Sequence, residues 1–266
     1  MKTRVISAIV ALIILVPLII VGGTAYNIGV YVIALLGLKE FLDIKSSKKP
    51  LPIFIQFMAY VFMTLVLLSN VNLITMDFEL DFRLLSALFI TFLLPVVLYH
   101  ERKKYSINDA FYMIGGLLFL SISMTLLMLV RNMGLEILVY LLLITTMTDI
   151  FAYVTGSLIG KHKLLEVISP NKTWEGMVGG TIMGVFVSAV FYHTVIDPEF
   201  SKVYLLGISL FLSVLGQYGD LVFSSIKRYF GKKDFSNIMP GHGGILDRLD
   251  SIIFVLLGFV FFVNIL

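Results

Sequence analysis

Charged side chains gather in one polar stretch, residues 224–250, which lies between two long apolar runs. Asp247 and Asp250 flank an arginine near its end, and Asp220 lies just before its start. Carboxylate oxygens suit Mg²⁺, which proteins usually hold with one or two carboxylates together with substrate phosphates. Lysine and arginine are suited to neutralising phosphate oxygens. The combination predicts phosphoryl or nucleotidyl transfer, which depends on positioning and charge neutralisation. The cations are Lys227, Arg228, Lys232, Lys233 and Arg248.

Helical spacing places several of these groups on shared faces. Asp220, Ser224 and Lys227 lie four and three positions apart, so their side chains project from one face of a helix. Asp247 and Asp250 lie three apart at the start of the next predicted helix, where a helix N-terminus favours negative charge. Either aspartate alone fits a helix cap. Three carboxylates at neighbouring helix ends instead favour a metal site made by Asp220, Asp247 and Asp250.

A glycine-rich turn precedes the last two aspartates, because Gly241, Gly243 and Gly244 surround His242. Glycine admits backbone angles that other residues avoid, and it lets a ligand approach closely. The turn is either a flexible hinge or a phosphate-binding turn that leads into a helix N-terminus. The aspartates that follow favour the phosphate-binding interpretation.

Four further polar residues lie outside the stretch. Asp149 is expected about 15 Å inside the sixth predicted span at 1.5 Å per residue, and an ionisable group in lipid is a functional candidate. Tyr153 lies one turn further along the same face. Asn171 and Lys172, in the loop before the seventh span, are candidates for binding a phosphate or a base edge. The neighbouring Trp174, taken by itself, is typical of an anchor at the membrane interface.

The composition requires burial in lipid. The 266 residues are 59% hydrophobic and 14% charged, with a mean hydropathy of +0.99, whereas a soluble domain is roughly half apolar and about a quarter charged. The chain has no cysteine, which excludes disulfides, thiolate metal sites and a cysteine nucleophile.

We therefore expect an all-α polytopic membrane protein with nine transmembrane helices, since lipid forces each span to satisfy its own backbone. An N-terminal region, 1–130, would hold five of them, and a catalytic region, 131–266, would hold four. The first apolar run alternatively resembles a signal peptide that is cleaved near residues 22–25. The predicted spans are residues 5–22, 25–42, 53–69, 83–99, 108–130, 135–158, 176–196, 203–223 and 250–265.

The basic residues predict the orientation of these spans. With nine spans, 17 of the 20 lysines and arginines fall on the side of the N-terminus. The loop 70–82 on the other side carries Asp77, Glu79 and Asp81. The N-terminus is thus expected in the cytoplasm and the C-terminus outside, in a cytoplasmic (inner) membrane with the site facing the cytoplasm. The loops on the basic side are 43–52, 100–107, 159–175 and 224–249.

The polar stretch resembles the motif of the phosphatidate cytidylyltransferase (CDP-diacylglycerol synthase) family. That motif combines a serine, a Lys-Arg pair, a Lys-Asp pair, Pro-x-His-Gly-Gly and Asp-Arg-x-Asp. Asp149 with Tyr153, and the loop 169–176, also look like family features, whereas the first half of the chain resembles the family only in its hydrophobic spans. The matching residues are Ser224, Lys227, Arg228, Lys233, Asp234, Pro240, His242, Gly243, Gly244, Asp247, Arg248 and Asp250.

The resemblance implies an enzyme that condenses CTP with phosphatidate to CDP-diacylglycerol and pyrophosphate in phospholipid biosynthesis. It implies a Mg²⁺ cofactor, with Asp149 assigned either to a second cation site or to a polar path for the lipid headgroup. The residues assigned to catalysis are Asp220, Ser224, Lys227, Arg228, His242, Asp247, Arg248 and Asp250. Those assigned to substrate binding are Asn171, Lys172, Lys233, Gly243, Gly244, Asp149 and Tyr153.

Two alternatives stay open at this point. The first is a CTP-dependent enzyme that acts on another membrane lipid phosphate or on a polyprenol. The second, from a different class, is an ion-coupled transporter, although transporters often show inverted repeats and midplane sites, and this chain shows no convincing repeat. The expected partners are CTP, phosphatidate and membrane lipid, with no nucleic acid, and the resemblance suggests a homodimer.

Overall fold

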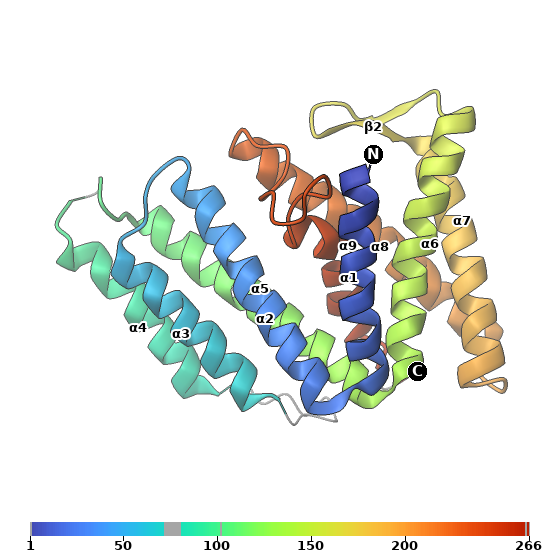
Figure 1. Cartoon of the computed structure of the whole chain (residues 1–266), viewed down its shortest axis with the longest axis horizontal. Helices are drawn as coiled ribbons and strands as arrows, with labels where there is room; N and C mark the ends of the chain where they lie inside the picture. Colours follow the sequence, from blue (N-terminus) through green and yellow to red (C-terminus); the bar gives the residue numbers. More distant parts are fainter. Residues whose placement is uncertain (1, 72–80, 102, 264, 266) are drawn as a thin grey trace. The chain divides into compact units, whose positions relative to one another are not determined.

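The computed structural model describes residues 2–71, 81–101, 103–263 and 265, without the side chains of residues 2–5 and 8. Within these residues the chain forms nine α-helices, each of which overlaps one of the nine predicted segments (Figure 1). The helices are α1 (Lys2–Val21), α2 (Gly23–Ser46), α3 (Ile53–Ser69), α4 (Phe82–Leu98), α5 (Ile107–Met133), α6 (Leu135–Ile159), α7 (Trp174–Phe191), α8 (Lys202–Tyr229) and α9 (Leu246–Phe259).

Four helices in the described part of the chain are long and apolar enough to cross a membrane, by length and composition. They are α5, α6, α8, and α7 together with η1 (Tyr192–Ile196), the π-helical turn that continues it. The remaining helices are shorter, less apolar or only partly described. A mostly helical membrane protein therefore agrees with the prediction, while the count of nine spans and their orientation stay predictions. Asp77 and Glu79, in the predicted acidic loop, lie outside the described residues.

The chain divides into two compact units. The first consists of Met1–Asn132 together with Asp234–Ile245, and the second of Met133–Lys233 together with Leu246–Leu266. The polar stretch thus belongs to both units, because the chain leaves the second after α8, contributes one segment to the first, and returns at α9. The predicted catalytic role of the C-terminal region stays a prediction.

In the first unit, a buried carboxylate connects the end of α2 to the start of α5. The Asp109 side chain pairs with Lys45, 2.5 Å away, and also with Lys49. Its other oxygen accepts bonds from the backbone and hydroxyl of Ser106 at 2.9 and 2.7 Å. A buried charge requires such partners. Two lysines of the predicted basic loop therefore hold two helices together in addition to carrying charge.

In the second unit, α6 and α7 pack along small residues and lie side by side (Figure 1). A Cβ atom at Gly180 would lie 2.5 Å from the Thr148 carbonyl oxygen and 2.7 Å from the Ala152 Cβ. Small residues at such crossings let helix backbones approach closely in lipid. The glycines at the start of the seventh apolar segment therefore serve helix packing.

One face of α8 carries polar residues every fourth position, and each bonds to a neighbouring helix. Interhelical hydrogen bonds of this kind stabilise helix pairs in membranes by about 0.6 kcal/mol on average. They fix the rotation of α8 about its axis, and with it the direction in which the side chains near its C-terminal end project. The bonds are Tyr140–Ser209 at 2.8 Å, Thr148–Ser213 at 2.7 Å and Thr181–Gln217 at 2.8 Å.

A two-stranded antiparallel hairpin joins α6 to α7, where the sequence analysis expects only a loop. Its strands are β1 (Lys163–Leu165) and β2 (Ser169–Thr173). The ammonium of Lys163 donates to the Pro170 carbonyl at 2.7 Å, and the Thr173 hydroxyl caps α7 by accepting from Gly176 N at 3.1 Å. Strands this short show no recognisable alternation of apolar and polar residues, so the sequence did not predict them.

Candidate active site

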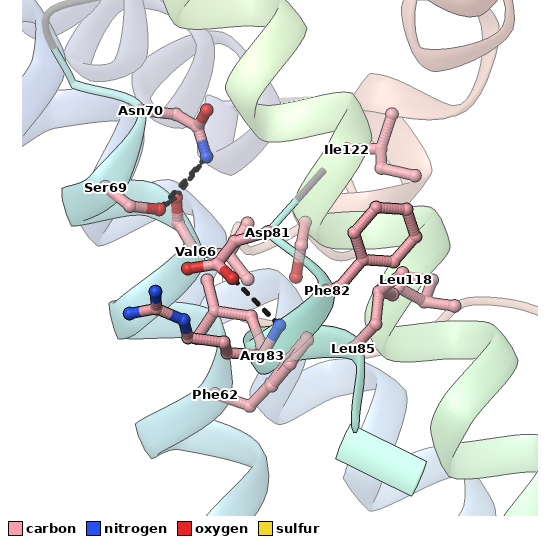
Figure 2. A pocket seen from close by; sticks show the side chains of 12 residues that line it. Phe62, Val66, Ser69, Asn70, Asp81, Phe82, Arg83, Leu85, Leu118 and Ile122 are labelled. Atoms are coloured by element: carbon pink, nitrogen blue, oxygen red, sulfur yellow. Dashed lines mark hydrogen bonds between the residues drawn. The ribbon is translucent and has the colours of Figure 1, made fainter. Parts of the chain in front are cut away.

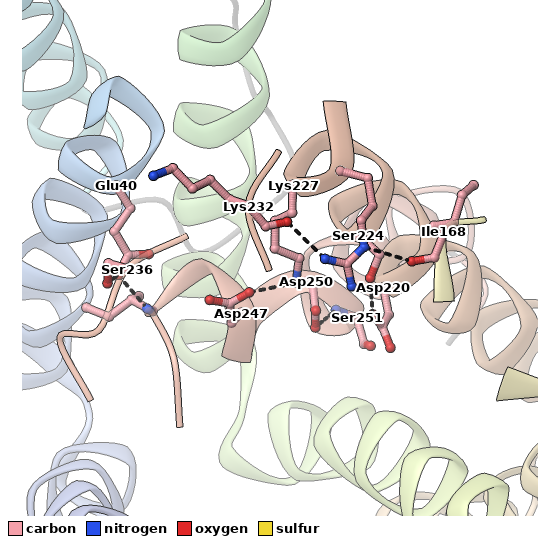
Figure 3. Close-up of polar contacts among 12 residues, drawn as sticks. Glu40, Ile168, Asp220, Ser224, Lys227, Lys232, Ser236, Asp247, Asp250 and Ser251 are labelled. Atoms are coloured by element: carbon pink, nitrogen blue, oxygen red, sulfur yellow. Dashed lines mark hydrogen bonds and ion pairs between the residues drawn. The ribbon is translucent and has the colours of Figure 1, made fainter. Parts of the chain in front are cut away.

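The face of α8 that helical spacing predicts for Asp220 and Ser224 is present in the second unit. The Ser224 hydroxyl donates to Asp220 Oδ1 at 3.2 Å (Figure 3). The Lys172 ammonium, from strand β2, reaches the other oxygen of Asp220 at 2.5 Å. The hairpin therefore brings a predicted substrate-binding lysine to a predicted metal ligand, a meeting that spacing along α8 alone does not reveal.

Lys227 and Asp247 form a buried ion pair between α8 and α9. Lys227 Nζ lies 2.6 Å from Asp247 Oδ1, and the two side chains are 9% and 4% exposed (Figure 3). Asp247 lies in the first turn of α9, where the helix N-terminus adds a favourable field. The close pairing and the helix N-terminus both stabilise the Asp247 carboxylate.

Three carboxylates from three helices interact electrostatically in this unit. Asp220 of α8 is a neighbour of both Asp149 of α6 and Asp250 of α9. Lys172 and Arg248 supply opposite charge close to Asp149. The electrostatic neighbours of Asp220 are therefore Asp149 and Asp250, while Asp247 pairs with Lys227. The metal-binding role predicted for Asp220, Asp247 and Asp250 stays a prediction.

The helices that carry these groups approach each other closely at Gly219, next to Asp220. A Cβ atom there would lie 2.7 Å from the Asp250 carbonyl oxygen and 2.8 Å from the Phe254 Cβ. A larger residue would push α9 away from α8. Gly219 therefore sets the separation between the backbones that bear Asp220 and Asp250.

A cavity of about 430 Å³ opens beside these groups in the second unit. Its wall contains the hairpin as well as α6, α7 and α8, so it unites four predicted site residues outside the polar stretch with Asp220. Gln217 also lines it and was missed by the sequence analysis, although its position one turn before Asp220 is a usable signal. The polar lining residues include Asp149, Tyr153, Asn171, Lys172, Gln217 and Asp220.

Arg228 bonds to two backbone carbonyl groups, and its predicted phosphate-binding role stays a prediction. Its guanidinium donates to the Lys232 carbonyl at 3.0 Å and to the Ile168 carbonyl in the hairpin at 3.3 Å (Figure 3). It therefore connects the end of α8 to the hairpin that carries Lys172. Lys233 is exposed where the chain leaves the second unit.

The predicted glycine turn belongs to the first unit. Met239 N donates to the Gly243 carbonyl at 3.0 Å, and His242 N donates to the Met239 carbonyl at 2.8 Å. Gly241 and Gly243 have φ values of 79° and 84°, in the region that favours glycine. The Ser7 hydroxyl of α1 lies 2.8 Å from His242 Nδ1 and donates to the Pro240 carbonyl at 3.1 Å. The turn is thus a defined structure with its histidine held on one nitrogen.

The donor set fits a magnesium ion that shares its coordination with a substrate. Among the described residues, no group of three or more histidine, aspartate or glutamate side chains forms a metal cage by itself. Mg²⁺ does not require one, because it is usually bound by one or two carboxylates, water and substrate phosphates. Asp220 and Asp250, with hard oxygen atoms and adjacent cations, have the appropriate chemistry.

A second cavity, of about 920 Å³, lies in the first unit (Figure 2). Its charged lining residues are Asp81, which caps α4 by accepting from Arg83 N at 2.8 Å, and Arg83 itself. The remaining wall is mainly apolar, and it has neither paired carboxylates nor clustered cations among its described lining residues. We therefore assign no chemistry to it.

Comparisons with known proteins found relatives that match nearly the whole chain. Phosphatidate cytidylyltransferases of Staphylococcus haemolyticus (strain JCSC1435) and Staphylococcus saprophyticus (strain ATCC 15305) are 38% and 37% identical over 256 residues, which cover 96% of each chain. That of Staphylococcus aureus (strain COL) is 36% identical over 263 residues with the same coverage. The model of the cytidylyltransferase family matches residues 2–266. Since the match spans nearly the whole chain, including every candidate site residue, the chain belongs to the cytidylyltransferase family.

Proposed function

We propose that this chain is a membrane enzyme that transfers the cytidylyl group of CTP to phosphatidate, giving CDP-diacylglycerol and pyrophosphate. Relatives named phosphatidate cytidylyltransferase match 96% of the chain. The observation that supports the proposal most directly is the cavity in which Lys172 meets Asp220, beside Asp149. It combines the cation and the carboxylates that a reaction between two polyanions requires.

In the proposed reaction, a phosphate oxygen of phosphatidate attacks the α-phosphorus of CTP. A new oxygen–phosphorus bond forms, the bond to the β-phosphate oxygen breaks, and pyrophosphate leaves. A phosphate monoester has a second pKa near 6, so the attacking oxygen is already ionised near neutral pH and needs no general base. The protein's work is to orient the two phosphates and mask their charge.

We expect three cations to provide this masking. Lys172 and Lys227 hold Asp220 and Asp247, respectively, and each ammonium carries a charge suited to a phosphate oxygen. Arg248 adds a third positive charge near Asp149. The His242 turn, with its two left-handed glycines, would wrap a phosphate through backbone amides.

The proposal includes Mg²⁺, held by Asp220 and Asp250 together with Asp247. When bound, Mg²⁺ would neutralise phosphate charge and align the reacting oxygens. Ser224, which bonds to Asp220 at 3.2 Å, would keep that carboxylate oriented or contact a phosphate oxygen. The other parts of the proposal are nine spans with a cytoplasmic N-terminus, a site that faces the cytoplasm, and a homodimer.

The assay uses purified protein, labelled CTP, Mg²⁺ and phosphatidate in mixed micelles, with polyprenyl phosphate as a parallel substrate. We expect pyrophosphate release and a labelled CDP-lipid only when phosphatidate is present. Asp220→Asn should abolish the product without lowering the protein level. Turnover only with the polyprenyl substrate, or uptake into liposomes without turnover, would exclude the proposed function.

A further inference from the structure

The first unit contains a fully buried carboxylate outside the motif, Glu40 of α2, whose side chain has no exposed surface. A carboxylate buried in this way is strongly unfavourable unless hydrogen bonds compensate it. Its partners therefore indicate what the residue is there to hold.

A single oxygen of Glu40 holds both ends of one segment. Oε1 accepts from the Ser236 hydroxyl at 2.6 Å (Figure 3) and from the Ile245 backbone N–H at 2.8 Å. The bridge between Met239 and Gly243 and the His242 side chain lie between these two donors in the sequence. Glu40 thus closes the segment 236–245 into a loop at its base.

Gly244 is explained by the same carboxylate. A Cβ atom at Gly244 would lie between 2.5 and 2.7 Å from three atoms of the Glu40 carboxyl group, closer than real Cβ contacts allow. The second glycine of the His-Gly-Gly sequence is therefore required by the approach of Glu40. The carboxylate and the glycine form one unit of structure.

We propose that Glu40 is a positioning residue for the cytidylyl-transfer site, acting through the segment 236–245. The inference rests on the proposed function. Glu40 fixes the amide of Ile245, and the next residue begins α9, the helix that carries Asp247 and Asp250. The same oxygen defines the loop that presents His242. Glu40 does not touch the reacting atoms in this account; it fixes the loop that carries His242 and the backbone of Ile245, the last residue before α9.

The test compares Glu40→Leu with Glu40→Gln. Leucine is of similar size but accepts no hydrogen bond, whereas the glutamine carbonyl oxygen can still accept from Ser236 and Ile245. Because misplacement by about 1 Å can cost on the order of 10²-fold in rate, Glu40→Leu should lower kcat by about 10²-fold. Glu40→Gln should keep most of the activity. The matched control is Asp43→Leu, which replaces an exposed carboxylate one turn along the same helix and should leave the enzyme active.

A second readout separates positioning from general stability. The chain lacks cysteine, so a spin label at Asn237→Cys, an exposed position inside the loop, is specific. Its spectrum should show increased mobility with Glu40→Leu and not with Glu40→Gln. Ser236→Ala removes one of the two donors, and it should raise the mobility partly even if Glu40→Leu fails to fold.

The outcomes distinguish the inference from the proposed function. No turnover by the unmodified protein would exclude the proposed function itself. An active unmodified protein with a fully active, folded Glu40→Leu variant would overturn only the role of Glu40. Loss of activity without any change in label mobility, in both Glu40→Leu and Ser236→Ala, would also overturn it, because a positioning residue must act through the loop.

Discussion

The buried pair of Lys227 and Asp247 permits a direct separation of structural from catalytic roles. We predict that Lys227→Met and Asp247→Leu each destabilise the protein strongly, whereas the double variant regains most of the stability and none of the activity. Each single variant leaves one charge buried beside an apolar group. The double variant leaves no buried charge at this position. Its replacements are similar in size to the original side chains, so the packing is kept.

The magnitude follows from the distance and the burial. At 2.6 Å, two opposite unit charges attract by about 6 kcal/mol with an effective dielectric constant of about 20. Desolvation of two side chains that are 9% and 4% exposed offsets much of this attraction. Loss of one partner should therefore cost about 3–5 kcal/mol, and the double variant should lie within about 1 kcal/mol of the unmodified protein.

The free energy of unfolding would be measured by circular dichroism in mixed micelles titrated with a denaturing detergent. CDP-lipid formation would be measured on the same preparations. The four proteins of the cycle give the coupling energy between the two residues. If the double variant is more stable than the single variants but shows no more turnover, Lys227 and Asp247 serve the reaction as well as the fold.

Two results would refute this reasoning. Single variants that lose less than about 1 kcal/mol would show that the pair is solvated like a surface salt bridge. A double variant that recovers turnover together with stability would show that the charges serve the fold alone, and Asp247 would then be removed from the proposed metal ligands.

Three further predictions concern packing and the cofactor. Gly219→Ala should destabilise the protein by about 1–3 kcal/mol through overpacking against α9, whereas Gly207→Ala on the same helix, with no atom within 4 Å of the added Cβ, should be neutral or stabilising; equal unfolding midpoints in thermal melts would contradict this. Ser213→Ala should lower the free energy of unfolding by about 0.6 kcal/mol through loss of the bond to Thr148, with turnover unchanged; a loss above about 2 kcal/mol would exceed the usual strength of such bonds. Chelation with EDTA should abolish CDP-lipid formation and added Mg²⁺ should restore it; turnover that persists in chelator would remove the metal from the proposed function.

The helices were predictable because their signal is local. An apolar run must be helical in lipid whatever its neighbours are, and each of the nine predicted segments overlaps a helix in the described chain. The ninth segment, 250–265, was placed too far along the chain, because α9 ends at Phe259. The face shared by Asp220 and Ser224 was predictable for the same reason, since four residues make about one helical turn. The observed bond between these two side chains, at 3.2 Å, agrees with it.

The partners of the charged groups were not predictable, because they lie far apart in the sequence. The pairing of Lys172 with Asp220 depends on a hairpin whose strands leave no periodic pattern. Glu40 meets Ile245 only because α2 and the loop belong to the same unit. No local pattern records such a meeting.

The sequence by itself determined the class of protein, the helices and the residue types of the site, since composition and spacing along one helix are properties of the chain alone. Only the tertiary structure decided which carboxylate faces which cation. Asp247 is paired with Lys227, whereas Asp149 interacts electrostatically with Asp220 and Asp250. The physical reason is the close approach of helices at Gly219 and Gly180. Such approaches set the rotation and separation of each helix pair, and through them the distances between charges.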